Sequence, residues 1–250
     1  MTRHVKGLRS VRAALATVAL VLPLAAVATG GSGTFRMNDP NQGDKTTMTI
    51  EYSGDRIRSS TDQADNSYGL VIGDKMYIVM NEGGSPHVVD AAQMYALVKQ
   101  MNANPGEDFA SDLDMQKFVS LESTGKSETV AGVTGEVHRL SYVDREGQTR
   151  TEDLVLSKDP RAYGLTSSFM RMMDIAQQTT NVSTDATAQL SARLRSMQAG
   201  IVRLGDKMHL IAISGDTPAA ERFDLPAEPQ ALPDLHGLQL PGFGGQGDEQ

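Results

Sequence analysis

The chain has 250 residues, no cysteine, and 23 basic against 31 acidic residues, for a net charge of −8 at pH 7. The lack of cysteine excludes disulfides, a lipid-bearing lipobox thiol, thiolate metal sites and a cysteine nucleophile. The acidic balance argues against nucleic acid and anionic lipid surfaces as partners, and the length suffices for one domain with a substantial core.

The first 28 residues have the pattern of a secretory signal. Four basic residues stand before a nearly unbroken apolar run over 13–28, which ends in the A-x-A cleavage motif Ala26-Val27-Ala28. The run is short for a transmembrane helix, so we interpret residues 1–28 as a signal peptide cleaved before Thr29, with an uncleaved anchor as the alternative. Cleavage leaves 19 basic and 31 acidic residues, a net charge of −12, on a periplasmic or otherwise exported soluble protein without a stable membrane anchor.

The next segment predicts a lead-in followed by a β-meander. Residues 29–45 are rich in Gly, Asn and Asp, and we expect a flexible segment there, with 34–37 as an optional first strand. From Thr46 to residue 85, apolar and polar residues alternate in short runs separated by Gly-Asp turns. This pattern is typical of antiparallel strands that have one apolar face.

Two glycine motifs invite a functional interpretation. Gly73-Asp74-Lys75-Met76 recurs as Gly205-Asp206-Lys207-Met208, with a shorter version at 54–56; a repeated binding loop is one interpretation, and ordinary tight turns are the other. Gly125-Lys126-Ser127 resembles the end of a nucleotide-binding loop. However, Ser120 stands where that loop needs glycine, and a strand-like stretch follows instead of a helix, so we reject nucleotide binding.

Three helices are predicted from capping residues and apolar stripes. Asp90 precedes a helix over 91–102, Asp159-Pro160 opens a second helix, and Asp185 opens a third. Methionine adapts to varied apolar ligands, but it also fills ordinary cores, so both roles stay open for these stripes. The candidate lining of a ligand cavity is Met94, Leu97, Met101, Leu165, Phe169, Met172, Met173, Leu190, Leu194 and Met197.

The remaining segments complete a sheet. Residues 127–159 predict a central hairpin of β-branched and aromatic residues, 201–213 a late hairpin, and 221–225 a short final strand. The tail from 227 to 250 is rich in Pro and Gly, and we expect it to be disordered. We therefore predict one α+β domain over 46–226, a curved antiparallel sheet whose concave face is covered by helices.

A family resemblance supports this fold. The run Gly125 to Gly132, the hairpin after it and the late Arg222-Phe223-Asp224-Leu225-Pro226 resemble the exported bacterial family called domain of unknown function 4412, and more distantly the LolA-like lipoprotein carriers. The resemblance spans residues 46–232 and implies an unclosed half-barrel. In the carrier relatives the concave side receives acyl chains or an apolar protein segment. Gly135 and His138 stand where the family often has cysteine and tyrosine.

Catalytic and metal signals are weak. The histidines at 87, 138, 209 and 236 lack metal-ligand spacing, and the acidic stretch 107–114 lacks the EF-hand pattern. A copper(I) thioether site at Met170-Arg171-Met172-Met173 lacks histidine or cysteine support. We expect no cofactor. A dispersed Ser-His-carboxylate triad stays open, because triads are recognised by geometry.

These observations point to a binding function and do not indicate any catalysed reaction. We interpret the protein as an exported, non-enzymatic binding module for an apolar ligand, either a lipid chain or a lipidated or apolar protein segment. The alternative is an envelope sensor or protein-interaction protein that acts through a sheet edge or the C-terminal tail.

Overall fold

The computed structural model describes residues 30–38, 45–64, 67–100, 115–180 and 185–231. The expected signal peptide, the acidic stretch 107–114, Met101 and residues 232–250 lie outside these ranges. No helix within them has the length and apolar character needed to cross a membrane.

One antiparallel sheet forms the framework of the described chain, in the strand order β6-β5-β4-β3-β2-β1-β11-β10-β9-β8-β7. The end strands β6 and β7 do not pair with each other, so the sheet is unclosed. The strands are β1 (Gly30–Asn38), β2 (Lys45–Ser53), β3 (Arg56–Thr61), β4 (Tyr68–Ile72), β5 (Lys75–Glu82), β6 (Ser85–Asp90), β7 (Met115–Val130), β8 (Val133–Asp144), β9 (Thr149–Ser157), β10 (Gly200–Leu204) and β11 (Met208–Ser214).

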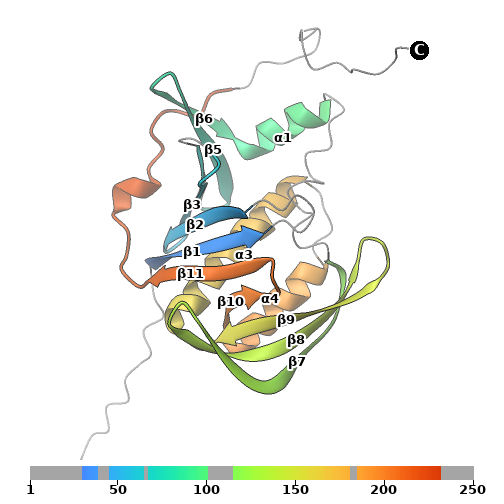
Figure 1. The fold of residues 1–250 in the computed structure, drawn as a ribbon. Helices are drawn as coiled ribbons and strands as arrows, with labels where there is room; N and C mark the ends of the chain where they lie inside the picture. The colour runs from blue at the N-terminus through green and yellow to red at the C-terminus, as the bar shows by residue number, and fades with distance from the viewer. Residues whose placement is uncertain (1–29, 39–44, 65–66, 101–114, 181–184, 232–250) are drawn as a thin grey trace, which may run out of the picture.

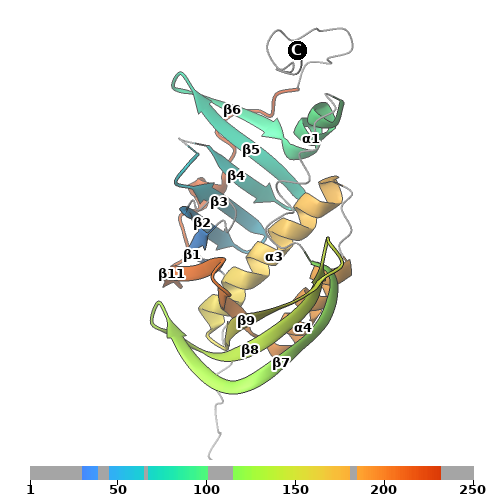
Figure 2. The same cartoon turned by 45° about the vertical axis from the view of Figure 1, so that its right-hand side comes forward.

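Helices cover the concave side of this sheet, as Figures 1 and 2 show. The long helix α3 (Pro160–Thr180) packs against β10, β11, β1, β2 and β5. Helix α4 (Asp185–Met197) packs against β7 and α3, and α1 (Ala91–Gln100) packs against β5, β6 and α3. The predicted α+β class, with an unclosed antiparallel sheet and helices over its concave face, is confirmed.

Local sequence signals explain where the first two helices begin. The backbone N–H of Ala92 donates to Asp90 Oδ1 at 2.8 Å, and that of Arg161 donates to Asp159 Oδ1 at 2.9 Å. These side-chain acceptors satisfy amide groups that have no partner within the helix. Both predicted caps are confirmed.

Glycines let α3 lie unusually close to the sheet. A Cβ atom at Gly200 of β10 would stand 2.1 Å from the backbone carbonyl carbon of Ala162, and one at Gly33 of β1 would stand 2.2 Å from Leu165 Cδ2. Both distances are far shorter than a van der Waals contact. Gly200 is therefore required by packing, because the Ala162 backbone cannot move aside, whereas a Cβ at Gly33 would force the buried Leu165 side chain to shift.

The structure differs from the sequence interpretation at both ends of the domain. Residues 30–38, expected within a flexible lead-in over 29–45, form β1 in the middle of the sheet, paired with β2 and β11. The described part of the domain therefore extends upstream of Thr46 to Gly30, and the optional strand over 34–37 lies within β1. The predicted strand over 221–225 is wrong, because Ala220–Phe223 forms a short 3-10 helix, η2, followed by irregular chain. Residues 227–231, expected within the disordered tail, are described, and Gln230 N–H donates to Val88 O at 2.8 Å.

Candidate functional site

The structure places most of the candidate cavity residues in the filled core. Five of them are between 0 and 8 % exposed, and Phe169 and Met197 pack against the same cluster. Met94 and Leu97 on α1 are half-buried, and Met101 lies outside the described residues. The five core residues are Leu165, Met172, Met173, Leu190 and Leu194. Around α3 and α4 these side chains act as core.

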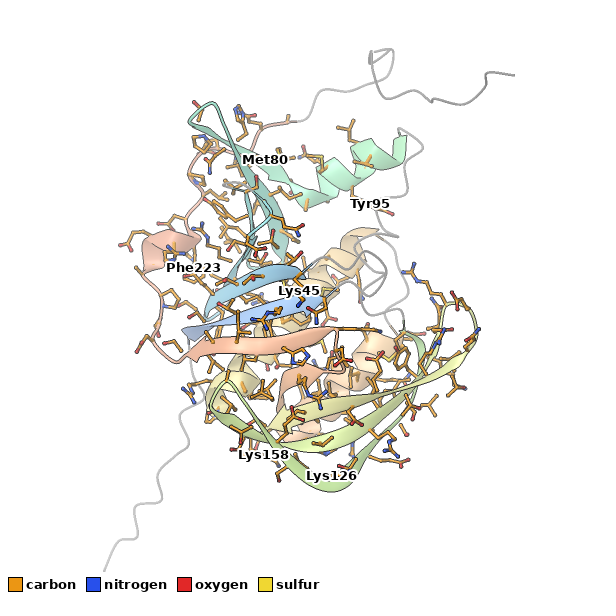
Figure 3. The ribbon with its side chains drawn as sticks, in the orientation of Figure 1. Lys45, Met80, Tyr95, Lys126, Lys158 and Phe223 are labelled. Carbon is orange, nitrogen blue, oxygen red and sulfur yellow. The ribbon has the colours of Figure 1, made fainter. Side chains whose placement is uncertain are left out.

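Packing is looser at the other end of the concave side, beneath α1. Alternate residues of β5 point toward α1 and α3, because Met76 packs against the α3 cluster and side chains two apart share a face. On both elements the apolar side chains are half-buried. We call this set the α1 apolar cluster: Met76, Ile78, Met80, Met94, Leu97 and Val98. Figure 3 shows Met80 and Tyr95 at this end of the molecule. This cluster is the candidate apolar site.

A polar pocket of about 710 Å³ opens beside the middle of β8, the first half of β9 and the turn between β10 and β11. Arg203 forms two 2.8 Å hydrogen bonds to the Glu128 carboxylate, and Lys207 Nζ lies 2.8 Å from Glu152 Oε1. Burial is the largest single influence on the pKa of Lys207 and lowers it, but the hydrogen bonds and charges of Glu152 and Tyr142 together outweigh burial and raise the pKa. The lining is Arg139, Thr151, Glu152, Asp153, Arg203, Gly205, Asp206 and Lys207. Because its best-placed cations are already paired, we place the candidate site elsewhere.

A serine, a histidine and a carboxylate do meet at the β7–β8 pair, but their order is not that of a catalytic triad. Ser123 Oγ donates to Glu136 Oε1, and His138 Nε2 lies 4.0 Å from Glu136 Oε2. In a triad the imidazole stands between hydroxyl and carboxylate and accepts the hydroxyl proton. Here the carboxylate stands in the middle, so His138 cannot serve Ser123 as its base in this arrangement.

The Gly-Lys-Ser motif is a β-bulge. The register between β7 and β8 shifts between Ser123 and Lys126, and Gly125 has φ +70°. Thr124 Oγ1 donates to Val137 O at 2.7 Å and fixes the bulge. Glycine is required here for its backbone conformation, and the rejection of a nucleotide-binding loop agrees with the strand that continues to Val130.

The repeated Gly-Asp motifs are tight turns, and two of them anchor α3. Gly54 and Gly73 both have φ +60°. Arg171 of α3 donates from Nη1 to Asp55 O at 3.0 Å and from Nη2 to Gly73 O at 2.7 Å. Its neighbours Met170 and Met172 are buried in the core. Sequence analysis missed this anchor, because a basic residue between methionines carries no signal for distant carbonyl groups.

Metal ligands do not gather in the described ranges: no three His, Asp or Glu side chains there lie close enough to hold an ion. His87, His138 and His209 stand on three different strands, β6, β8 and β11.

Comparison with known proteins gives only distant structural similarity. No family model matches the sequence, and no curated protein matches it. The crystal structure of MucB in complex with MucA(peri) aligns with a TM-score of 0.36 and 16% identity, over 84% of this chain and 60% of that one. The complex structure of Pseudomonas aeruginosa MucA/MucB aligns with a TM-score of 0.34 and 14% identity, over 82% of this chain and 60% of that one. The chain therefore spans less than two thirds of the length of these matched chains.

Proposed function

We propose that the protein is an exported, non-enzymatic binding module of the bacterial cell envelope whose ligand is a lipid chain or an apolar or lipidated protein segment. One observation supports this proposal most: the concave side is filled unevenly. Five of the seven candidate side chains on α3 and α4 are almost completely buried, whereas all six apolar side chains of the α1 apolar cluster keep part of their surface exposed.

The energetics of burial favour an apolar occupant at that cluster. Apolar surface contributes about 25 cal/mol per Å² removed from water, so the roughly 8 kcal/mol of a micromolar complex needs about 330 Å² before ordering costs. Three of the six side chains are methionines, which adjust their shape to different apolar partners at low cost. Among the described residues, the ten of helix α1 cover this cluster.

The strand edges support the protein-interaction alternative less well. The β6 edge already accepts a hydrogen bond from Gln230, and β7 has three irregularities in its pairing with β8. Bulges and charged residues protect edges against further pairing. Val119 on β7 is half-exposed, yet Lys117 and Glu122 flank it on the same strand. We therefore place the apolar ligand first.

The test uses the mature chain and cis-parinaric acid, a fluorescent acyl-chain probe. We expect saturable binding that Leu97→Asn weakens at least tenfold, because a polar amide would stand where the acyl chain is buried. Ile211→Asn is the matched control, since Ile211 is 39% exposed on β11, outside the α1 apolar cluster, and its substitution should leave binding unchanged. Native mass spectrometry after mild purification checks for a bound endogenous lipid.

Absence of probe binding, or equal losses in both variants, would contradict the proposal. Thermal unfolding of each variant, monitored by circular dichroism, checks that both variants are folded, so that a loss of binding is not caused by unfolding.

A further inference from the structure

The chain passes over its own sheet after the last strand. Residues 215–231, which we call the strap, run from the end of β11 to the outer edge of β6, on the outside of the sheet (Figures 1 and 2). Sequence analysis expected a strand and the start of a disordered tail here. The strap instead carries ordered contacts along its length.

Its first half is anchored firmly. Phe223 of η2, labelled in Figure 3, is completely buried, and η2 packs against β3. Arg222 donates two hydrogen bonds to the Glu51 carboxylate on β2, at 2.6 and 2.5 Å. Asp224 pairs with Arg56 at 3.1 Å, although both side chains are largely exposed and the pair contributes little. Phe223 is therefore the fixed point of the strap.

The second half of the strap covers a separate apolar patch. Leu225 and Ala227 pack on Leu70, Val79 and Val88, which are all completely buried. Beyond them, Gln230 N–H donates to Val88 O, and its side-chain Oε1 lies 3.2 Å from His87 Nδ1. Each such hydrogen bond contributes only about 1 kcal/mol net. This half is thus held by a small apolar contact and a few weak bonds.

The strap packs on one face of β4–β6, and the opposite face of β4 and β5 belongs to the α3 core and, on β5, to the candidate site. On β4, Leu70 belongs to the strap patch, whereas the next residue, Val71, belongs to the α3 core. On β5, Val79 faces the strap, while Met76 packs toward α3 within the α1 apolar cluster. Alternation along a strand makes this division strict. A change in how the strap holds β4–β6 therefore reaches the floor of the candidate site directly.

We propose that the second half of the strap, residues 225–231, is a latch that opens about Phe223 and controls the access of an apolar ligand to the α1 apolar cluster. When it is closed, the strap presses β4–β6 toward α1 and α3. When it opens, these strands and α1 separate from α3 and admit the ligand. The nature of the ligand rests on the proposed function, whereas the latch acts on the strands whether or not ligand is present.

The absence of native cysteine allows a clean lock. A His87→Cys/Gln230→Cys pair joins the strap to β6 when oxidised and frees it when reduced. Thr129→Cys/Thr134→Cys is the matched control, because those two hydroxyl oxygens lie 3.0 Å apart across the β7–β8 hairpin, on strands that the strap does not cover. Both pairs are made in the mature chain and compared in both redox states.

We expect oxidation of the strap pair to slow hydrogen–deuterium exchange in β4–β6 at least tenfold, with β8 and β9 unchanged, and to weaken cis-parinaric acid binding at least threefold. Oxidation of the control pair should change neither measurement. Binding that is equal in both redox states of the strap pair overturns the latch and leaves the proposed function standing. If no form binds the probe, the proposed function is overturned, and slowed exchange in β4–β6 alone then supports the strap as a clamp on these strands.

Discussion

The two ends of the concave side are built from similar residues but packed differently. Where α3 and α4 meet β1, β7, β10 and β11, most aliphatic and methionine side chains interdigitate and are almost completely buried. Where α1 meets β5 and β6, the same residue types remain half-buried beneath a single short helix. The first end therefore forms the core of the fold, and the looser packing of the second end is what our proposal of a ligand site rests on.

Paired truncations should give the largest effect and test this comparison directly. Leu194→Ala on α4 removes a side chain that is 3 % exposed and should lower the free energy of unfolding by about 2–5 kcal/mol. Leu97→Ala on α1 should cost about 1 kcal/mol or less, because the side chain is already partly in contact with water. Urea denaturation measures both. Equal losses would show that the α1 end is core as well.

The closeness of α3 to β10 gives the next effect. Gly200→Ala places a methyl group against the backbone of Ala162, which cannot move without shifting α3. We expect a loss near the upper end of the roughly 1–3 kcal/mol that overpacking costs. Gly215→Ala is the control, because its new Cβ would meet only the Arg161 side chain at 3.4 Å. If Gly200→Ala left the free energy of unfolding unchanged, α3 and β10 would have room between them for an added methyl group.

Sequence analysis could predict the parts of this fold that depend on local pattern. Alternation along β2 correctly places Ile50 and Tyr52 inside, and Asp159-Pro160 marks the start of α3. The lead-in over 29–45 was expected to be flexible because it is rich in Gly, Asn and Asp, whereas the β1 glycines are tightly packed: Gly33 lies against Leu165 of α3, and Gly31 lies against Tyr52.

The difference in side-chain burial between the two ends of the concave side also could not be predicted from the sequence. Met94 on α1 and Met172 on α3 belong to stripes of the same kind, and their burial depends on which strands pass beneath them. The strap was missed for a related reason: Phe223 and Leu225 show no periodicity, and only the tertiary fold brings them against β3–β6.

A smaller, pH-dependent effect belongs to the start of α3. Hydrogen bonds from Arg161 lower the pKa of Asp159 below its ordinary value near 4. The stabilisation is therefore fully present above that ordinary value and is lost as pH falls through the lowered one. Asp159→Asn keeps a capping oxygen but removes the charge, so we expect a loss of about 1 kcal/mol or less at pH 7 that shrinks as pH falls below the ordinary pKa of Asp159.

Urea denaturation between pH 3 and 7 measures this difference between native protein and variant. Asp216→Asn, which changes the same charge at an exposed position of the strap, is the control. A difference in the free energy of unfolding that persists unchanged at pH 3 would show that the charge of Asp159 does not contribute to stability.

The smallest effect concerns a polar atom enclosed in the filled end. Tyr52 is 3 % exposed, its hydroxyl group has no hydrogen-bond partner, and it is wedged against Gly31 and Gly164. An unsatisfied buried hydroxyl costs free energy, so Tyr52→Phe should raise the free energy of unfolding at pH 7 by about 1 kcal/mol or less.

Burial, with help from the Asp159 charge, raises the pKa of Tyr52. The native protein should therefore lose stability relative to Tyr52→Phe as pH rises above about 10, where only the unfolded phenol ionises. Thermal unfolding at pH 7 and pH 10.5 measures both shifts. A loss above 2 kcal/mol at pH 7 would mean that the hydroxyl has a partner, and that packing at this end depends on a polar contact as well as on close apolar fit.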